Sequence, residues 1–93
     1  MSTETLIEEE LDVIEKQEVE NNREIVLYND DFHTFDFVIE SLIKVCKHTS
    51  LQAEQCTYIV HYNGKCGVKK GNMDKLKPIC TALLDRGLTA EIV

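Results

Sequence analysis

Apolar residues recur at helical spacing from residue 35 onward. Six of them follow the i, i+3, i+4, i+7 pattern: Phe35, Val38, Ile39, Leu42, Ile43 and Cys46. This pattern predicts a helix from about Thr34 to His48, with Thr34 as its N-cap. The next four residues, Thr49-Ser50-Leu51-Gln52, form a capping box, which predicts a second helix that runs to about Tyr62 and ends at Gly64.

A third amphipathic helix is predicted closer to the end of the sequence. Its apolar face consists of Leu76, Ile79, Cys80, Leu83 and Leu84. Gly87 is expected to close this helix. Pro78 must lie in or near its first turn or kink it, because proline has no N–H to donate.

Three shorter segments have the pattern of strands. Glu24–Tyr28 is largely apolar, Lys65–Lys69 is a short strand after Gly64, and Leu88–Ile92 alternates as a half-buried strand should. The predicted order along the chain is therefore strand, helix, helix, strand, helix, strand.

Composition and charge divide the chain into two parts. The chain has 93 residues, 43% of them apolar, which supports one small domain with a single core. Its formal charge of −7 belongs to residues 1–22, which hold eight acidic side chains and only one base, Lys16; residues 23–93 hold nine acids and nine bases. We expect residues 1–22 to be a flexible acidic extension, since they have too little apolar surface to fold alone, and residues 23–93 to be the domain.

The acidic excess argues against binding to nucleic acid, because proteins that bind nucleic acid neutralise its phosphates with a basic surface. No apolar run reaches the length of a membrane span, and the first residues, Met1-Ser2-Thr3-Glu4, lack the positive start of a secretory signal. The expected location is therefore the cytoplasm, without contact to a membrane.

The cysteines show no C-x-x-C pair of the kind that zinc knuckles and redox dithiols use. There are four: Cys46, Cys56, Cys66 and Cys80. Cys46 and Cys80 lie among helically spaced apolar residues, so we interpret the cysteines as core thiols in a reducing compartment. The alternative is a metal site assembled in space from Cys46, Cys56, His48 and His61.

Three small polar residues, Asn29-Asp30-Asp31, stand between the first strand and the first helix. Their side chains all accept hydrogen bonds, so together they suit a cation with several N–H donors, such as an ammonium group. An ordinary strand-to-helix turn is the alternative, because Asn and Asp also bond to nearby backbone and cap helices. His61, three residues before Gly64, is a further candidate. Its imidazole can project beyond the helix toward a neighbouring loop. The alternative is that His61 is a structural residue, or an exposed cation that the helix dipole favours.

Together these motifs resemble the ClpS family, the bacterial N-end-rule adaptors of the Clp protease. The resemblance covers residues 24–93 and rests on Asn29-Asp30-Asp31 with the phenylalanines that follow it, and on Val60-His61 within the run 60–68. It implies an α/β (α+β) sandwich, preceded by a flexible N-terminal extension. In that fold a three-stranded antiparallel sheet packs with three helices in the order β-α-α-β-α-β.

The resemblance also implies a function. Members of the family bind N-degron substrates, which begin with a free α-amino group and a large hydrophobic residue (Leu, Phe, Tyr or Trp), and deliver them to a ClpA-type or ClpC-type AAA+ unfoldase for degradation by ClpP. Such an adaptor is not an enzyme and needs no cofactor, and we expect a monomer. The alternative is a domain that docks on a AAA+ unfoldase and modulates it without reading N-termini. A His/Asp hydrolase is a third hypothesis, but no nucleophile with an oxyanion-hole motif can be recognised.

The family's functional residues correspond to three groups in this chain. The group for the substrate α-amino group is Asn29, Asp31 and His61, with Asp30 adjoining; an amide, a carboxylate and a neutral imidazole offer three acceptors to the three donors of an ammonium. The hydrophobic pocket is expected to consist of Phe35, Val38, Val60 and Leu88, with His33 on its rim. The group for docking to the unfoldase is Asn72 and Lys77.

Four positions depart from the family pattern. Phe35 stands in place of Met and His33 in place of Thr. Thr34 stands in place of Pro, and Asn72 in place of an acidic residue that contacts the unfoldase. A stiff ring at residue 35 is expected to narrow the pocket and so to affect which first residue is preferred. The change at Asn72 is expected to affect the strength of docking to the unfoldase.

Overall fold

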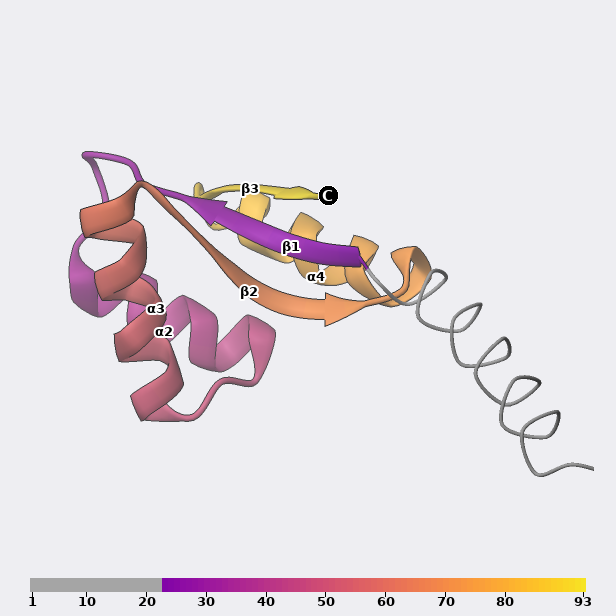
Figure 1. Ribbon diagram of the computed structural model, residues 1–93, viewed down its shortest axis with the longest axis horizontal. Coiled ribbons are helices and arrows are strands. Elements are labelled where there is room, and N and C mark those ends of the chain that lie inside the picture. The colour runs from indigo at the N-terminus through magenta and orange to yellow at the C-terminus, as the bar shows by residue number, and fades with distance from the viewer. Residues whose placement is uncertain (1–22) are drawn as a thin grey trace, which may run out of the picture.

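The computed structural model describes residues 23–93 and contains the predicted elements in the predicted order (Figure 1). They are β1 (Arg23–Tyr28), α2 (Phe35–Cys46), α3 (Ser50–Asn63), β2 (Lys65–Gly71), α4 (Met73–Asp85) and β3 (Thr89–Ile92). The predicted acidic extension, residues 1–22, lies outside the described residues. Within the described range, no helix has the length and apolar character that crossing a membrane requires.

The three strands form one antiparallel sheet in the order β2-β1-β3. β1 is central: Arg23 pairs with Gly71 at one end of the strand, and Tyr28 pairs with both Lys65 and Thr89 at the other. β2 continues to Gly71 instead of ending near Lys69, because β1 offers backbone partners along its whole length. The sequence pattern misses these two additional residues because neither is apolar.

The predicted caps set the limits of the first two helices. The Thr34 hydroxyl accepts a hydrogen bond from the backbone N–H of Phe37 at 3.1 Å. Thr49 and Gln52 form both bonds of the predicted capping box. α3 ends at Gly64, whose φ of 91° lies in the left-handed region that glycine adopts without strain. α2 ends at Cys46, the last residue of the apolar pattern and just before the expected end at His48, because Lys47 takes a left-handed conformation.

α4 begins at Met73 because Asn72 caps it; the Asn72 side-chain oxygen accepts a hydrogen bond from the N–H of Lys75 at 2.8 Å. Pro78 therefore lies in the second turn, just beyond the first, and the helix continues past it to Asp85. Gly87 closes the helix with a φ of 87°, as predicted.

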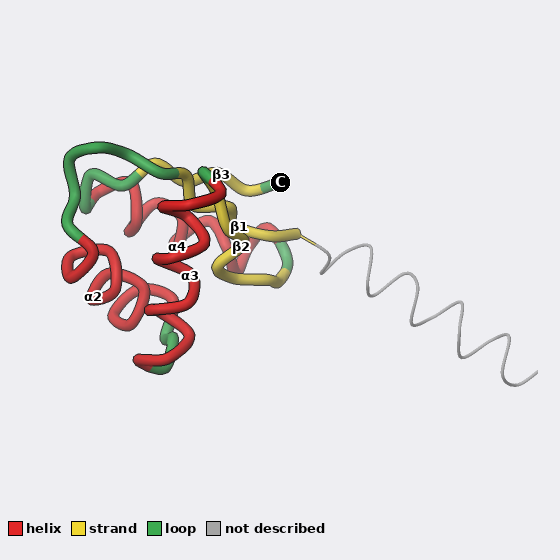
Figure 2. Tube along the Cα trace, turned by 60° about the vertical axis from the view of Figure 1, so that its left-hand side comes forward, coloured by secondary structure: helices red, strands yellow, loops and turns green. Residues whose placement is uncertain are grey.

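One hydrophobic core joins the sheet to the helices, which pack together beside the strands (Figure 2). Its largest fully buried side chains are Ile25, Leu27, Leu42, Leu76, Leu83, Cys46 and Ser41. Alternate residues of β1 thus face the helices, which is the pattern of a sheet covered on one face. The expected sandwich of a three-stranded antiparallel sheet and three helices is confirmed.

The cysteines divide into two pairs, all of them free thiols. Cys46 and Cys80 are buried in the core as predicted, and burial raises the pKa of Cys46 to about 11. Cys56 and Cys66 are only half-buried, so the interpretation as core thiols is too simple for this pair. Burial, and then the hydrogen bond with the Cys56 thiol, raise the pKa of Cys66 to about 12.

Candidate functional site

A hollow of about 310 Å³ lies where four elements meet. The residues that border it come from the end of β1 and the loop after it, from the start of α2, from the end of α3 and from Leu88, just before β3. All the residues expected to bind a substrate border this hollow: Asn29, Asp30, Asp31, His33, Phe35, Val38, Val60, His61 and Leu88. Asn72 and Lys77, expected to dock the unfoldase, belong to the start of α4 and do not border it.

A backbone hydrogen bond brings the polar triplet and His61 to the same rim. The N–H of Asn29 donates to the carbonyl of Gly64 at 2.9 Å, so the end of β1 is fixed to the end of α3. The left-handed Gly64 turns the chain directly from α3 into β2, whose first residue pairs with the last residue of β1. His61 lies in the last turn of α3 and borders the same hollow as Asn29.

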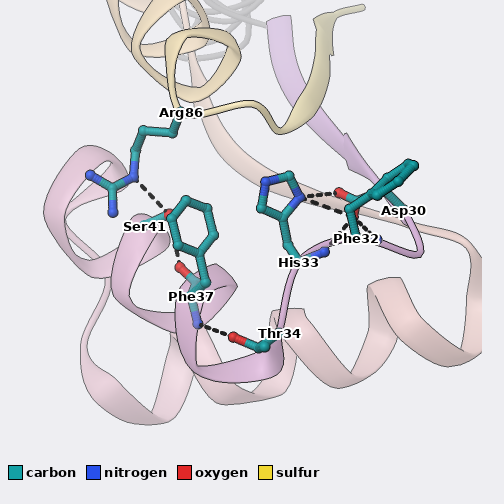
Figure 3. A network of polar contacts seen from close by, with 7 residues as sticks. All are labelled: Asp30, Phe32, His33, Thr34, Phe37, Ser41 and Arg86. Atoms are coloured by element: carbon teal, nitrogen blue, oxygen red, sulfur yellow. Dashed lines mark hydrogen bonds and ion pairs between the residues drawn. The ribbon is translucent and has the colours of Figure 1, made fainter.

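The Asp30 carboxylate holds the loop between β1 and α2 in shape (Figure 3). One of its oxygens accepts hydrogen bonds from the backbone N–H groups of Phe32 and His33, both at 2.8 Å. Both oxygens lie 2.9 Å from Nδ1 of His33. Burial alone would raise the pKa of Asp30, but the hydrogen bonds from His33 and Phe32 outweigh it and hold that pKa below its usual value. Asp30 is thus ionised and occupied by its own loop, while Asn29 and Asp31 are exposed.

His33 connects this loop to two helices (Figure 3). Its ring stacks on Phe37 with centroids 4.8 Å apart, and the guanidinium of Arg86 lies over the same phenyl ring at 5.1 Å. Nε of Arg86 donates to the Ser41 hydroxyl at 2.8 Å, and that hydroxyl donates to the Phe37 carbonyl at 2.8 Å. The loop is therefore fixed to α2 and to the end of α4. Sequence analysis missed these contacts because they join residues as many as 45 positions apart.

Some residues of the hollow's apolar wall also belong to the hydrophobic core. Val60 and Leu88 are 5% and 3% exposed, and Val38 is half-buried. Leu88 is placed by the end of α4: the N–H of Gly87 donates to Leu84 O at 2.9 Å, and the N–H of Leu88 donates to Leu83 O at 3.2 Å, which is a Schellman motif. These side chains can form the pocket and stabilise the fold at once.

Aromatic rings surround His61. The ring of Phe35 meets the His61 imidazole edge-on at 5.0 Å, and Tyr62 meets it edge-on from another direction at 4.9 Å. Phe35 also contacts Tyr58 at 5.3 Å. The imidazole is therefore oriented by packing, which favours a fixed geometry for any bond that it makes. Sequence analysis missed Tyr58 and Tyr62, although the spacing of Tyr58, three residues before His61 and four before Tyr62 on one helix, was a usable signal.

The cysteine and histidine metal site considered as an alternative is not assembled. Cys46 and His48 border a different hollow from the one that His61 borders. Among residues 23–93, no three His, Cys, Asp or Glu side chains are grouped as a metal ion would require.

Comparison with known proteins assigns the chain to a family. The sequence model described as ATP-dependent Clp protease adaptor protein ClpS matches residues 18–91. The chain belongs to the ClpS family. It is 38% identical over 64 residues to the ClpS adapter protein of Clostridium acetobutylicum, and 37% identical over 65 residues to that of Acetivibrio thermocellus. These matches cover 69% and 70% of this chain, but only 63% and 64% of the ClpS relatives, so the chain matches less than two thirds of their length.

Two further comparisons agree with this assignment. The ClpS adapter protein of Thermosynechococcus vestitus is 36% identical over 69 residues, which cover 73% of each chain. The solved structure of Agrobacterium tumefaciens ClpS2 bound to L-phenylalaninamide matches with a TM-score of 0.73 and 19% identity, over 76% of this chain and 93% of that one. At this identity the structural match shows that the ClpS fold is shared.

Asp30 gives a pH-dependent prediction. Its lowered pKa means that the native state binds fewer protons there than the unfolded state does. Its contribution to stability is therefore fully present above the unfolded pKa of about 3.9 and is lost as the pH falls through the lower native value. Asp30→Asn should lower the free energy of unfolding by about 1 kcal/mol at neutral pH, and the difference should disappear in acid.

Urea unfolding at several pH values measures this effect. Asp31→Asn is the matched control, since Asp31 is adjacent and exposed; it should leave stability nearly unchanged. Equal effects of the two substitutions, or an Asp30 effect that is independent of pH, would contradict the role given to this carboxylate.

Proposed function

We propose that this ClpS-family chain is an adaptor that binds N-degron substrates through their free α-amino group and large hydrophobic first residue. The observation that supports this proposal is the combination of exposed acceptors and an apolar wall in one hollow. Asn29, Asp31 and His61 stand on the rim, and Val38, Val60 and Leu88 lie below. The Agrobacterium ClpS2 structure holds L-phenylalaninamide, a ligand with a free amino group and a benzyl side chain, which is the chemistry that this hollow suits.

The rim can distinguish a chain terminus from an internal peptide bond by the number of donors. An α-ammonium offers three N–H donors and a positive charge to an amide oxygen, a carboxylate and an imidazole nitrogen. An internal amide offers one donor and no charge, so two acceptors would lose water without gaining a partner. Each such loss costs about 1–3 kcal/mol. In this proposal Asp30, whose oxygens are occupied by its loop, acts through its charge and by positioning Asn29 and Asp31.

The apolar wall supplies the preference for a hydrophobic first residue. Burying a Leu or Phe side chain contributes roughly 1.5–3 kcal/mol, whereas micromolar affinity requires about 8 kcal/mol. The charged hydrogen bonds at the rim must therefore contribute much of the remainder. Phe35 borders the hollow and is braced by His61 and Tyr58, so it is suited to restrict the width of an entering side chain.

The residues with hydroxyl groups that border the hollow use those groups in other hydrogen bonds, which fits binding without catalysis. Thr57 donates its hydroxyl to the Ala53 carbonyl at 2.7 Å, and the Thr34 hydroxyl caps α2. The Tyr28 hydroxyl donates to the Glu91 carboxylate, which raises the pKa of Tyr28. The hydrogen bonds of the two threonines go to the backbone, so no base activates their hydroxyls. Glu91 does contact the Tyr28 hydroxyl, but it raises the pKa of Tyr28, whereas activation of a nucleophile requires a lowered pKa. We therefore favour an adaptor over a His/Asp hydrolase.

Delivery to a protease is the second half of the proposal. We infer that the exposed start of α4, with Lys77, docks on a ClpA-type or ClpC-type AAA+ unfoldase that works with ClpP in the cytoplasm, and that the adaptor acts as a monomer. Asn72 has a structural role in addition, since its side chain caps α4. The docking assignment therefore depends mainly on Lys77. A domain that docks without reading N-termini remains the alternative, and it would bind no peptide in the hollow.

Fluorescence anisotropy with labelled peptides tests the reading of N-termini. Peptides that begin with Phe or Leu should bind the full chain, and their N-acetylated forms should bind about 100-fold more weakly or not at all, because acetylation removes the charge and two donors. Asn29→Ala should also weaken binding, whereas Asn63→Ala, the same change at an exposed residue outside the hollow, should not. Equal affinity for free and acetylated peptides would exclude the proposal.

The role of Phe35 predicts how first residues are ranked. Ile and Val carry two heavy atoms on Cβ and are stiff at χ1, so they should pass a narrow entrance less easily than Leu. Phe35→Ala should widen the entrance and increase affinity for Ile peptides relative to Leu peptides. The control is Phe32→Ala, because Phe32 is 91% exposed and does not border the hollow. If Phe35→Ala weakens Leu and Ile binding equally, Phe35 is only a wall of the pocket.

A further inference from the structure

A second hollow, of about 410 Å³, lies at the other end of the same elements. The end of α2, the start of α3, the end of β2 and the start of α4 border it, whereas the candidate site uses the start of α2 and the end of α3. Its charged lining is mostly positive: Lys47, Lys69, Lys70 and Lys75, with Glu24 as the single acid. We call these four lysines the basic surface.

The basic surface is built into the fold. Nζ of Lys69 donates to the Cys46 carbonyl at 3.2 Å, which holds one positive charge against the end of α2. The side chain of Lys75 lies over Gly71, where an added Cβ would be 3.2 Å from the Lys75 Cδ. Among the described residues, none of the four lysines has a carboxylate oxygen within 4.0 Å, whereas Lys44 is paired with Glu40 at 2.6 Å. The charge of the basic surface is therefore not neutralised within residues 23–93.

The chain itself supplies the complementary charge. Residues 1–22 hold eight acids and one base, and residues 23–93 hold nine of each, so the whole formal charge of −7 lies in the first segment. This segment is followed in the chain by Arg23, which pairs with Gly71, and the next residue, Glu24, pairs with Lys70. It is therefore attached directly beside the basic surface.

We propose that residues 1–22 bind back onto the basic surface of the same chain as an acidic intramolecular ligand. Attachment at Arg23 gives the segment a high effective concentration at Lys70 and Lys75. A single exposed ion pair contributes little, so the contact depends on several carboxylates acting together and is sensitive to salt. No particular carboxylate needs a fixed partner, because the attraction comes from the summed charge.

The test compares amide spectra of two full-length chains by ¹H–¹⁵N NMR. One is the natural sequence, and the other has all eight acids of residues 1–22 replaced by Gln or Asn. At low salt, the amides of Lys47, Lys69, Lys70 and Lys75 should differ between the two spectra, and the difference should be lost at about 1 M salt, where charges are screened within about 3 Å. Superimposable spectra for residues 23–93 at low salt would overturn the proposal.

Charge reversal on the domain locates the contact. Lys70→Glu with Lys75→Glu, introduced into both chains, should abolish the difference between their spectra. Lys65→Glu, an exposed position at the opposite end of β2, should preserve it. A difference centred on Lys44 or Lys65, or one that disappears on dilution and so reports a second copy, would overturn the proposal. If the double variant does not fold, the salt-dependent comparison with the Lys65 control still decides. None of these measurements involves peptide binding, so failure here is distinct from failure of the proposed adaptor function.

Discussion

The hydrogen bonds of the Asp30 carboxylate determine the shape of the end of the molecule that holds the candidate site. A loop that connects a central strand to a helix must satisfy its own backbone donors, and here one carboxylate accepts from Phe32 and His33 and also engages the His33 ring. Because Asp30 serves the loop, Asn29 and Asp31 on either side remain exposed. His33 also stacks on Phe37, and Arg86 at the end of α4 lies over the same ring, so the loop is connected to α4 as well. Acceptors that are fixed before binding cost less entropy when a ligand arrives.

The two ends of the domain have opposite character. At one end, exposed acceptors surround an apolar hollow, which suits a cation attached to a hydrophobic group. At the other, four lysines border a polar hollow beside the attachment point of an acidic segment. α2 and α3 run between them, so each helix contributes one end to each surface. A ligand at one hollow therefore leaves the other accessible.

Sequence patterns predicted the features that depend on neighbouring residues. The caps at Thr34 and Thr49 and the left-handed Gly64 were predictable because their partners lie within a few positions. The motif at Asn29-Asp30-Asp31 was recognised, but the separate role of Asp30 was not, since Asn and Asp have the same turn chemistry in sequence.

Features that depend on distant residues were missed. The pairing that extends β2 to Gly71 and the contact of Arg86 with Phe37 exist only after folding. Asn72 was assigned to docking because the family resemblance places a docking residue at this position, and its role as the N-cap of α4 was missed.

The central claim, recognition of a free α-amino group beside an apolar side chain, is tested most directly by two small ligands. ¹H–¹⁵N NMR titration with L-phenylalaninamide should shift the signals of Asn29, Asp31, His61 and Leu88, whereas hydrocinnamamide, the same molecule without the amino group, should not. Equal shifts with both ligands would contradict the account.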